Sequence, residues 1–315
     1  MARQSSFRTV TSGLRRMSEK LMASVAAHAE HAISGLRRRM AARVSARSTP
    51  RQSPGSAVPS GAPVASLPVP DAVAMPAPAT LPDGVLIYAI GDVHGRADLL
   101  RTLVKRIEAD AESHKGTAHL VMLGDYVDRG FQSRQVIEFL MSDEVSQFET
   151  RYLKGNHEEA LMRFLDQPEY GPEWANYGGR ETLVSYGVRP PRSLTMNEEW
   201  VEAHARFVEA FPEDHLHFMR SLELSYRVGD YGFAHAGARP GRAFEEQQEH
   251  DLLWIRDEFL NAGGRDDVVV VHGHTPADDA YSDFRRINID TGAYFSGRLT
   301  AVRLEKDQIS FLKTR

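Results

Sequence analysis

Carboxylate, imidazole and carboxamide side chains recur in five short motifs that contain or are flanked by glycine. The motifs are GDVHG at 91–95, GDYVDRG at 124–130, GNHE at 155–158, HAG at 235–237 and GHT at 273–275. These side chains are the ligand set of a hard or borderline divalent metal ion that is bound without sulfur. Cysteine is absent from the chain, which excludes disulfides and thiolate sites and leaves the redox compartment undetermined.

Short apolar runs must position these motifs. Strands are predicted for VLIYAI at 85–90, AHLVML at 118–123, RYLK at 151–154 and VVVV at 268–271, and helices for ADLLRTLVKRIEAD at 97–110, SRQVIEFLM at 133–141 and EALMRFL at 159–165. The segment 286–304 predicts a closing hairpin around a glycine-containing turn. A lone Asp or His after a strand is usually structural, but the same order at successive strand ends indicates one shared site.

Taken together and in this order, the motifs resemble those of the phosphoprotein phosphatases within the calcineurin-like metallophosphoesterases, over roughly residues 85–305. The resemblance implies an α/β (α+β) fold, in which a β-sandwich of two mixed sheets is flanked by helices. A SAPNY segment is absent near the C-terminus, and NYGGRETLVSYG at 176–187 and IDTGAYFSGRLTAV at 289–302 are similar to the bacterial-type branch.

The resemblance also implies two divalent metal ions, which can lower the pKa of a water molecule and clamp the ester oxygens. The implied ligands are Asp92 and His94 for one ion, Asn156, His235 and His274 for the other, and Asp125 bridging both. His274 is preferred over His272 because the family pattern places the ligand before the Thr of GHT. Phosphodiesterase-type relatives carry a further histidine where this chain has Pro276. Manganese is the first expectation for the metal, and iron and zinc also suit these donors.

Four further residues are expected to act on the phosphate. Arg129 would hold phosphoryl oxygens with its planar guanidinium. His157 would be the general acid for the leaving alkoxide, and Asp128 would orient its ring. Arg256 resembles the family's second phosphate-binding arginine, and a surface ion pair with Asp257 or Glu258 is the alternative.

Three functions are weighed. The first is a phosphomonoesterase acting on phosphorylated proteins or peptides, at Ser/Thr or at Tyr. The second is hydrolysis of dinucleoside tetraphosphates, which is disfavoured because that group tends to lack the second aspartate of GDYVDRG, here Asp128. The third, a non-catalytic scaffold, is disfavoured because every ligand candidate is intact. The region 166–214 is expected to shape the rim of the cleft, where WANYGG at 174–179 either lines a pocket or turns the chain.

The chain before the catalytic region differs in composition. Residues 1–80 carry eleven Arg and Lys against three acids, whereas 81–315 carry 27 basic and 40 acidic residues. We expect a basic amphipathic tail at 1–47, helical or mostly disordered, a Pro/Ala/Ser-rich linker at 48–82 and a catalytic domain at 83–315. The tail suits an anionic membrane surface or an acidic partner, and no specific nucleic acid is expected.

The expected location is the cytoplasm, with peripheral attachment to a membrane through the tail as an alternative. An organellar transit peptide is a further alternative, because the tail is rich in Arg and Ser and poor in acids. No run approaches the roughly 18 apolar residues that suggest a membrane span, and no secretory signal is expected.

Overall fold

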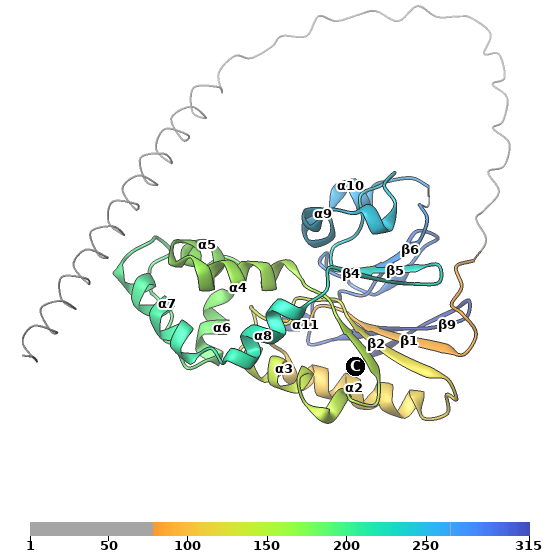
Figure 1. Cartoon of the computed structure of the whole chain (residues 1–315), viewed down its shortest axis with the longest axis horizontal. Helices are drawn as coiled ribbons and strands as arrows, with labels where there is room; N and C mark the ends of the chain where they lie inside the picture. Colours follow the sequence, from red (N-terminus) through yellow and green to blue (C-terminus); the bar gives the residue numbers. More distant parts are fainter. Residues whose placement is uncertain (1–77, 265) are drawn as a thin grey trace, which may run out of the picture. The chain divides into compact units, whose positions relative to one another are not determined.

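Two five-stranded sheets form the centre of the computed structural model, which describes residues 78–264 and 266–315. Their strand orders are β10-β9-β1-β2-β3 and β4-β5-β6-β8-β7 (Figure 1). The tail predicted at 1–47 and nearly all of the linker predicted at 48–82 lie outside the described residues. Each sheet mixes parallel and antiparallel pairs.

The strands are short, as befits a twisted sandwich. Those of the first sheet are β1 (Val85–Ile90), β2 (Thr117–Met122), β3 (Glu149–Tyr152), β9 (Thr300–Glu305) and β10 (Gln308–Lys313). Those of the second are β4 (Ser225–Val228), β5 (Tyr231–Ala234), β6 (Val269–His272), β7 (Tyr281–Ser282) and β8 (Arg286–Asn288).

The apolar run of β1 has two buried faces because successive side chains of a strand point to opposite sides of its sheet. Leu86, Tyr88 and Ile90 pack in the cluster that includes residues of the helices α2 (Ala97–Ala111) and α3 (Ser133–Leu140). Ile87 and Ala89 pack in the cluster shared with β5, β6 and β8 of the second sheet. The continuous apolar sequence is therefore a strand covered on both sides.

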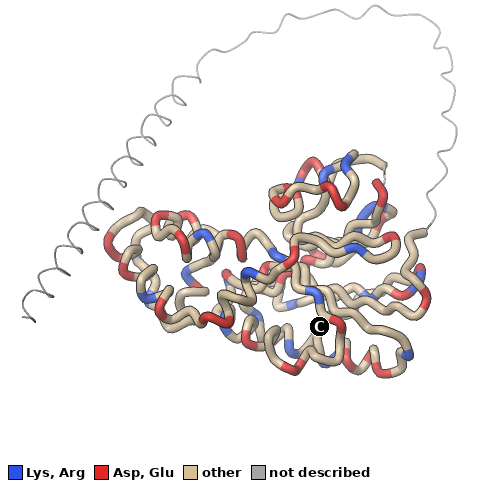
Figure 2. The backbone as a smooth tube through the Cα atoms, in the orientation of Figure 1, with Lys and Arg blue, Asp and Glu red and all other residues tan. Residues whose placement is uncertain are grey.

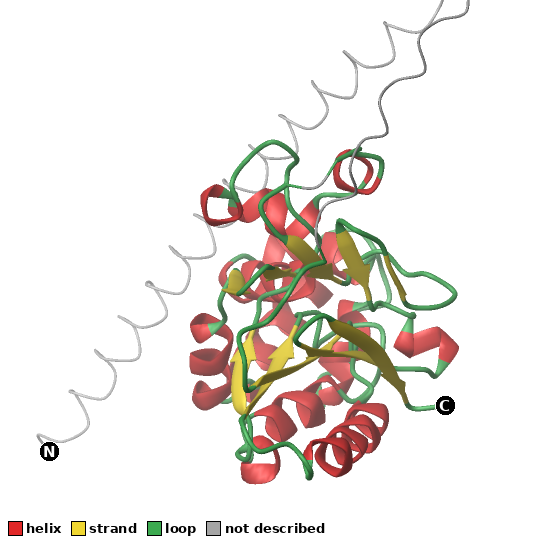
Figure 3. Cartoon of the chain, turned by 90° about the vertical axis from the view of Figure 1, so that its right-hand side faces the viewer, coloured by secondary structure: helices red, strands yellow, loops and turns green. Residues whose placement is uncertain are grey.

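Helices lie on both outer sides of the two sheets, which Figures 1 and 3 show from different directions. On the second sheet, α9 (Glu249–Trp254) and α10 (Asp257–Leu260) contribute Leu252 and Phe259 to a cluster with Val268 and Val270. The resulting order is helix, sheet, sheet, helix. The predicted fold of two mixed sheets flanked by helices is confirmed.

A group of helices between β3 and β4 packs around aromatic side chains. These helices are α4 (Asn156–Asp166), α5 (Gly171–Ala175), α6 (Gly179–Ser185), α7 (Glu198–Ala210) and α8 (Glu213–Ser221), with the short 3-10 turn η2 (Pro168–Tyr170) between α4 and α5. Two other 3-10 turns lie outside this group, η1 (Asp143–Val145) before β3 and η3 (Phe244–Glu246) after β5. Phe164 and Trp174 stack with ring centroids 4.6 Å apart, and Trp200 and Phe207 contact the same Phe164 ring. Acidic residues mark the outer turns of α7 (Figure 2).

The predicted closing hairpin at 286–304 is wrong. β8 pairs with β6 and β7 in the second sheet, whereas β9 pairs with β1 and β10 in the first. The short helix α11 (Ala293–Ser296) lies between β8 and β9 in the chain. Two apolar runs around a glycine turn do not reveal which sheet each run joins. None of the described helices has both the length and the apolar character needed to cross a membrane.

Candidate metal centre and active site

The loops that follow β1, β2, β3, β5 and β6 bring the motif side chains into one buried cluster. The cluster residues are each at most 5 % exposed, and they are Asp92, His94, Asp125, Asp128, Asn156, His157, His235 and His274. Open α/β sheets place ligands at the carboxyl ends of their strands, and these loops lie there. The motifs predicted at successive strand ends therefore lie together in one cluster, as expected from the sequence.

Backbone strain is concentrated in the same loops. Six described non-glycine residues have positive φ, and five of them are in the cluster or beside it: His94, Asp125, Asp128, Arg129 and His274. Such conformations cost on the order of 1–3 kcal/mol each and persist where surrounding structure holds them. Gly124, with φ of 97°, permits a close approach in which an added Cβ would lie 2.5 Å from the backbone nitrogen of Gly155.

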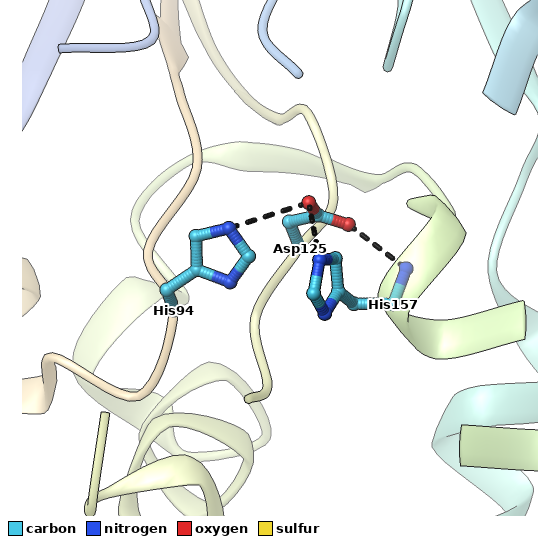
Figure 4. A group of neighbouring side chains, drawn as sticks. All are labelled: His94, Asp125 and His157. Atoms are coloured by element: carbon cyan, nitrogen blue, oxygen red, sulfur yellow. Dashed lines mark hydrogen bonds and ion pairs between the residues drawn. The ribbon is translucent and has the colours of Figure 1, made fainter. Parts of the chain in front are cut away.

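Asp125 lies between two groups of nitrogen donors. Its Oδ2 is 3.4 Å from His94 Nε2 and 3.8 Å from His157 Nε2, and its Oδ1 accepts a hydrogen bond from the backbone N–H of His157 (Figure 4). On the other side, Oδ1 is 3.4 Å from His235 Nε2. This arrangement is the one that a carboxylate bridging two metal ions requires.

The remaining proposed ligands surround the same space. Asn156 Oδ1 is 2.8 Å from His235 Nε2 and 2.9 Å from His274 Nδ1. Asp92 Oδ2 is 3.9 Å from His94 Nε2, and both carboxylate oxygens of Asp92 accept from the backbone N–H of His274 at 3.1 Å. Two groups of side chains have donor atoms close enough together to hold a metal ion. One is His94, Asp125 and His157, and the other is Asp125, His235 and His274. The first group contains His157, the expected general acid, in place of the expected ligand Asp92.

The hydrogen bonds of two imidazoles fix their tautomers. His94 Nδ1 is 2.9 Å from the carbonyl of Val127, and His235 Nδ1 is 3.0 Å from the carbonyl of Leu123. Because a carbonyl only accepts, each Nδ1 carries the proton and each Nε2 presents a lone pair to the cluster. Metal-binding histidines are typically oriented in this way.

The buried carboxylates of the cluster would be stabilised in their charged form by added positive charge. Burial raises the pKa of Asp92 and of Asp125, and a neighbouring carboxylate adds to each shift. Burial also lowers the pKa of His94 well below its usual range and that of His235 to about 3, so these imidazoles are neutral and can act as ligands. The donors therefore fit divalent cations, which when bound supply Lewis acidity and lower the pKa of water.

Arg129 reaches into the cluster. Its Nη1 donates to His94 Nε2 at 2.9 Å and its Nη2 to His157 Nε2 at 3.1 Å. Burial, followed by the charges of Arg129 and Arg256, lowers the pKa of His157. An incoming phosphate dianion would offset these charges and raise the affinity of His157 for the proton that a general acid needs.

Asp128 lies on the far side of the His157 ring. It accepts from His157 Nδ1 at 2.8 Å, Trp174 Nε1 at 2.9 Å and Thr182 Oγ1 at 2.7 Å. Burial raises the pKa of Asp128 to about 7 although the hydrogen bonds from Thr182 and Trp174 oppose the rise. The side chain is placed where it can orient His157.

WANYGG supports the site from the helical segment. The backbone N–H of Arg129 donates to the carbonyl of Gly178 at 3.1 Å, and the Tyr177 ring lies 6.1 Å from the His157 ring. With the Trp174 bond to Asp128, the stretch both turns the chain and contacts the catalytic candidates. The sequence left open whether this stretch lines a pocket or turns the chain, and the structure supports the turn.

Two acidic residues of the site received no role from the sequence. Glu158 accepts the backbone N–H of Asp125 and of Tyr126 at 2.8 Å and that of Gly155 at 2.9 Å, so it fixes two motif loops together. Asp290 is buried, and its charge adds to the raised pKa of Asp92. The available signal for Asp290 was its position after the run RINI at 286–289, two residues beyond the end of β8, since the other site carboxylates also follow strand ends.

Arg256 is exposed beside the cluster, with Nη1 3.5 Å from Oγ1 of Thr275, the residue after His274. Among the described residues no ion pair joins it to Asp257 or Glu258, and Glu258 is paired with Arg239 instead. His272 lies outside the cluster. Its Nδ1 donates to the carbonyl of Gly273 and its ring packs at 5.0 Å from that of Phe259.

Known proteins are similar to this chain over most of its described residues. The model of the calcineurin-like phosphoesterase family matches residues 85–307. The chain is 30 % identical over 240 residues to asymmetrical bis(5'-nucleosyl)-tetraphosphatase PrpE of Anoxybacillus flavithermus, covering 69 % of this chain and 90 % of the relative. It is 31 % identical over 236 residues to the protein of the same name from Geobacillus sp., covering 69 % and 89 %.

Solved structures are more distant. The cold-active protein-tyrosine phosphatase of a Shewanella species is 16 % identical with a TM-score of 0.48, covering 75 % of this chain and 83 % of that one. A metallophosphoesterase from Sphaerobacter thermophilus is 17 % identical with a TM-score of 0.41, covering 72 % and 87 %.

Proposed function

Because the chain belongs to the calcineurin-like phosphoesterase family, we propose that it is a metal-dependent hydrolase that cleaves dinucleoside tetraphosphates asymmetrically. The observation that carries the substrate is the 30–31 % identity to tetraphosphatases, which extends over about nine tenths of their length. This proposal reverses the order of the two enzyme functions weighed from the sequence. Asp128, which favoured the phosphatase there, supports the second candidate through its contact with His157.

The site suits a chain of phosphates. Asymmetrical hydrolysis adds water to one phosphorus and breaks one P–O–P bridge, which yields a nucleoside triphosphate and a nucleoside monophosphate. The Arg129 guanidinium, which faces His94 and His157, can bind two oxygens of the attacked phosphoryl group. Arg256 beside the cluster adds charge where further phosphates would lie.

A second function is favoured by one observation, the buried contact between His157 and Asp128. A phosphate leaving group is weakly basic and departs without much help, whereas a serine or threonine alkoxide needs a proton as the bond breaks. A histidine held by a carboxylate suits the second case. Phosphomonoesterase activity on phosphorylated proteins, at Ser/Thr or Tyr, is therefore our second candidate.

We propose manganese as the working metal, with iron and zinc as alternatives, because carboxylate, carboxamide and imidazole donors suit all three. The check is to strip the protein with a chelator and to restore each ion separately. Manganese should restore the highest kcat, and no recovery with any of the three would exclude this metal set.

The substrate test compares kcat/KM for diadenosine tetraphosphate with that for phosphoserine, phosphothreonine and phosphotyrosine peptides, with products separated by chromatography. We expect ATP and AMP from the dinucleotide and a higher kcat/KM for it than for any peptide. Two ADP molecules as products would overturn the asymmetrical cleavage, and a preference for peptides would replace the first candidate by the second. Asp125→Asn is the inactive control.

A further inference from the structure

Two exposed aromatic side chains stand beside the site and have no role so far. Tyr294 and Phe295 lie in α11 and are 38 % and 64 % exposed, with their rings edge to face at 4.9 Å. Single exposed aromatic residues are common on proteins, so exposure alone assigns nothing. The surroundings of this pair decide what it can bind.

Tyr294 lies next to groups that face the phosphate. Its ring centroid is 5.5 Å from that of His94 and 5.0 Å from the guanidinium carbon of Arg129. A phosphoryl group held by Arg129 would therefore lie beside Tyr294, and the Phe295 ring lies next to that of Tyr294 at 4.9 Å. A group attached to this phosphate on the side of α11 would contact the two exposed rings.

The pair is held in place before any ligand binds. An added Cβ at Gly292 would collide with the Phe295 ring, so this glycine lets the ring rest on the backbone. Arg96 Nη1 donates to the carbonyl of Ala293 at 3.1 Å, which ties α11 to the loop that carries His94. A prepositioned ring loses little conformational entropy on binding.

The other aromatic pair of the site is less available. Trp254 and Tyr177 are half-buried, their rings 6.1 Å apart, and Trp254 Nε1 donates to Glu159 at 2.6 Å. The Trp254 ring lies 6.3 Å from that of His274. The Trp254–Tyr177 pair packs beside the cluster of candidate ligands. The pair at α11 is more exposed and is therefore the better stacking surface.

We infer that Tyr294 and Phe295 form a platform on which a nucleobase of the substrate stacks. The inference rests on the proposed function, because a dinucleoside tetraphosphate carries a flat aromatic base beyond each end of its phosphate chain. Base stacking on aromatic side chains tolerates different bases, so the platform selects for a nucleoside and not for one base.

The test measures binding by calorimetry with manganese present, using AMP and ribose 5-phosphate as ligands that differ only by the base. Chromatography after each titration verifies that neither ligand was consumed. The wild-type chain should bind AMP about tenfold or more tightly, within the range of one stacked base. Phe295→Ala should reduce the affinity for AMP to that for ribose 5-phosphate, and Phe295→Trp should retain the difference.

Phe284→Ala is the matched control, because Phe284 is a 43 % exposed phenylalanine in the turn before β8, whereas the site follows the other end of that strand. It should leave both affinities unchanged. Equal affinity of wild type for the two ligands, or an AMP preference that survives in Phe295→Ala, would overturn the platform. If Phe295→Ala reduced the affinity for phenyl phosphate as strongly as the affinity for AMP, the nucleobase assignment would also be overturned. Since binding needs no turnover, a failure to cleave diadenosine tetraphosphate would refute the proposed function separately.

Discussion

At a pH well above the raised pKa of Asp128, which is about 7, Asp128→Asn removes a negative charge beside His157 while nearly preserving the size of the side chain. In the wild-type chain, one carboxylate oxygen accepts from His157 and Trp174 and the other accepts from the Thr182 hydroxyl. The Asn oxygen can take the first position, because a hydroxyl can turn to accept from the amide but the two N–H donors cannot. The ring of His157 should therefore keep its orientation and its tautomer.

The expected loss is that of a charge-assisted bond replaced by a neutral one. Hydrogen bonds to charged groups contribute about 1–2 kcal/mol more than neutral ones, which corresponds to about 5- to 30-fold in rate if the difference appears in the transition state. The loss should depend on the leaving group, since the proton on His157 matters more as the leaving oxygen becomes more basic. The variant should therefore lose less of its rate with diadenosine tetraphosphate than with an alkyl phosphate.

The assay is a series of substituted phenyl phosphates and one alkyl phosphate, with log kcat plotted against the pKa of the leaving group. Asp128→Asn should steepen this plot. His157→Asn supplies the second arm of a double-mutant cycle, and in that background Asp128→Asn should have little further effect. A uniform loss across the series, or additive losses in the double variant, would refute the proposed orienting role.

Three further predictions concern binding, strain and pH. Glu158→Gln should weaken manganese binding by about 10- to 100-fold in calorimetry, because its carboxylate fixes the loop of the bridging ligand, and unchanged affinity would contradict that role. Gly178→Ala and Gly187→Ala both place alanine at positive φ, costing roughly 1–2 kcal/mol of unfolding free energy. In urea unfolding, Gly178→Ala should lower the free energy of unfolding by more than Gly187→Ala does. The Cβ added at Gly178 would lie 2.6 Å from a backbone nitrogen, whereas the Cβ added at Gly187 meets open space. Burial lowers the pKa of His215, whose Nδ1 lies 2.9 Å from the Tyr186 hydroxyl, so the contribution of neutral His215 to stability should fade as the pH falls below its ordinary pKa of 6.5. The Tm advantage of wild type over His215→Asn should shrink from pH 7 to pH 5, and a growing advantage would contradict the sign.

The motifs that supply the candidate metal ligands could be read from the sequence because each motif is local. Asp125 and Asn156 belong to strand-end motifs whose residue types and order carry the chemistry within a few positions. Parallel strands then bring these loops to one edge by topology alone. For this reason the order of motifs predicted both the fold and the cluster of side chains.

Residues that act through long-range contacts gave no such signal. Trp174 and Thr182 reach Asp128 from about fifty positions away, and their packing is decided by the helical segment as a whole. The sheet membership of β8 and β9 depends on partners elsewhere in the chain. Substrate choice was the hardest point, since Asp128 alone does not separate a phosphate leaving group from an alkoxide.

The central claim is that one buried carboxylate joins two metal-binding groups into a hydrolytic centre. The most direct measurement is the number and affinity of manganese ions bound by wild type, Asp125→Asn and His235→Asn, from calorimetry and metal analysis of the dialysed protein. Wild type should bind two ions, Asp125→Asn should weaken both, and His235→Asn should weaken one. A single ion in wild type, or one ion left at full affinity in Asp125→Asn, would contradict the bridging position of Asp125.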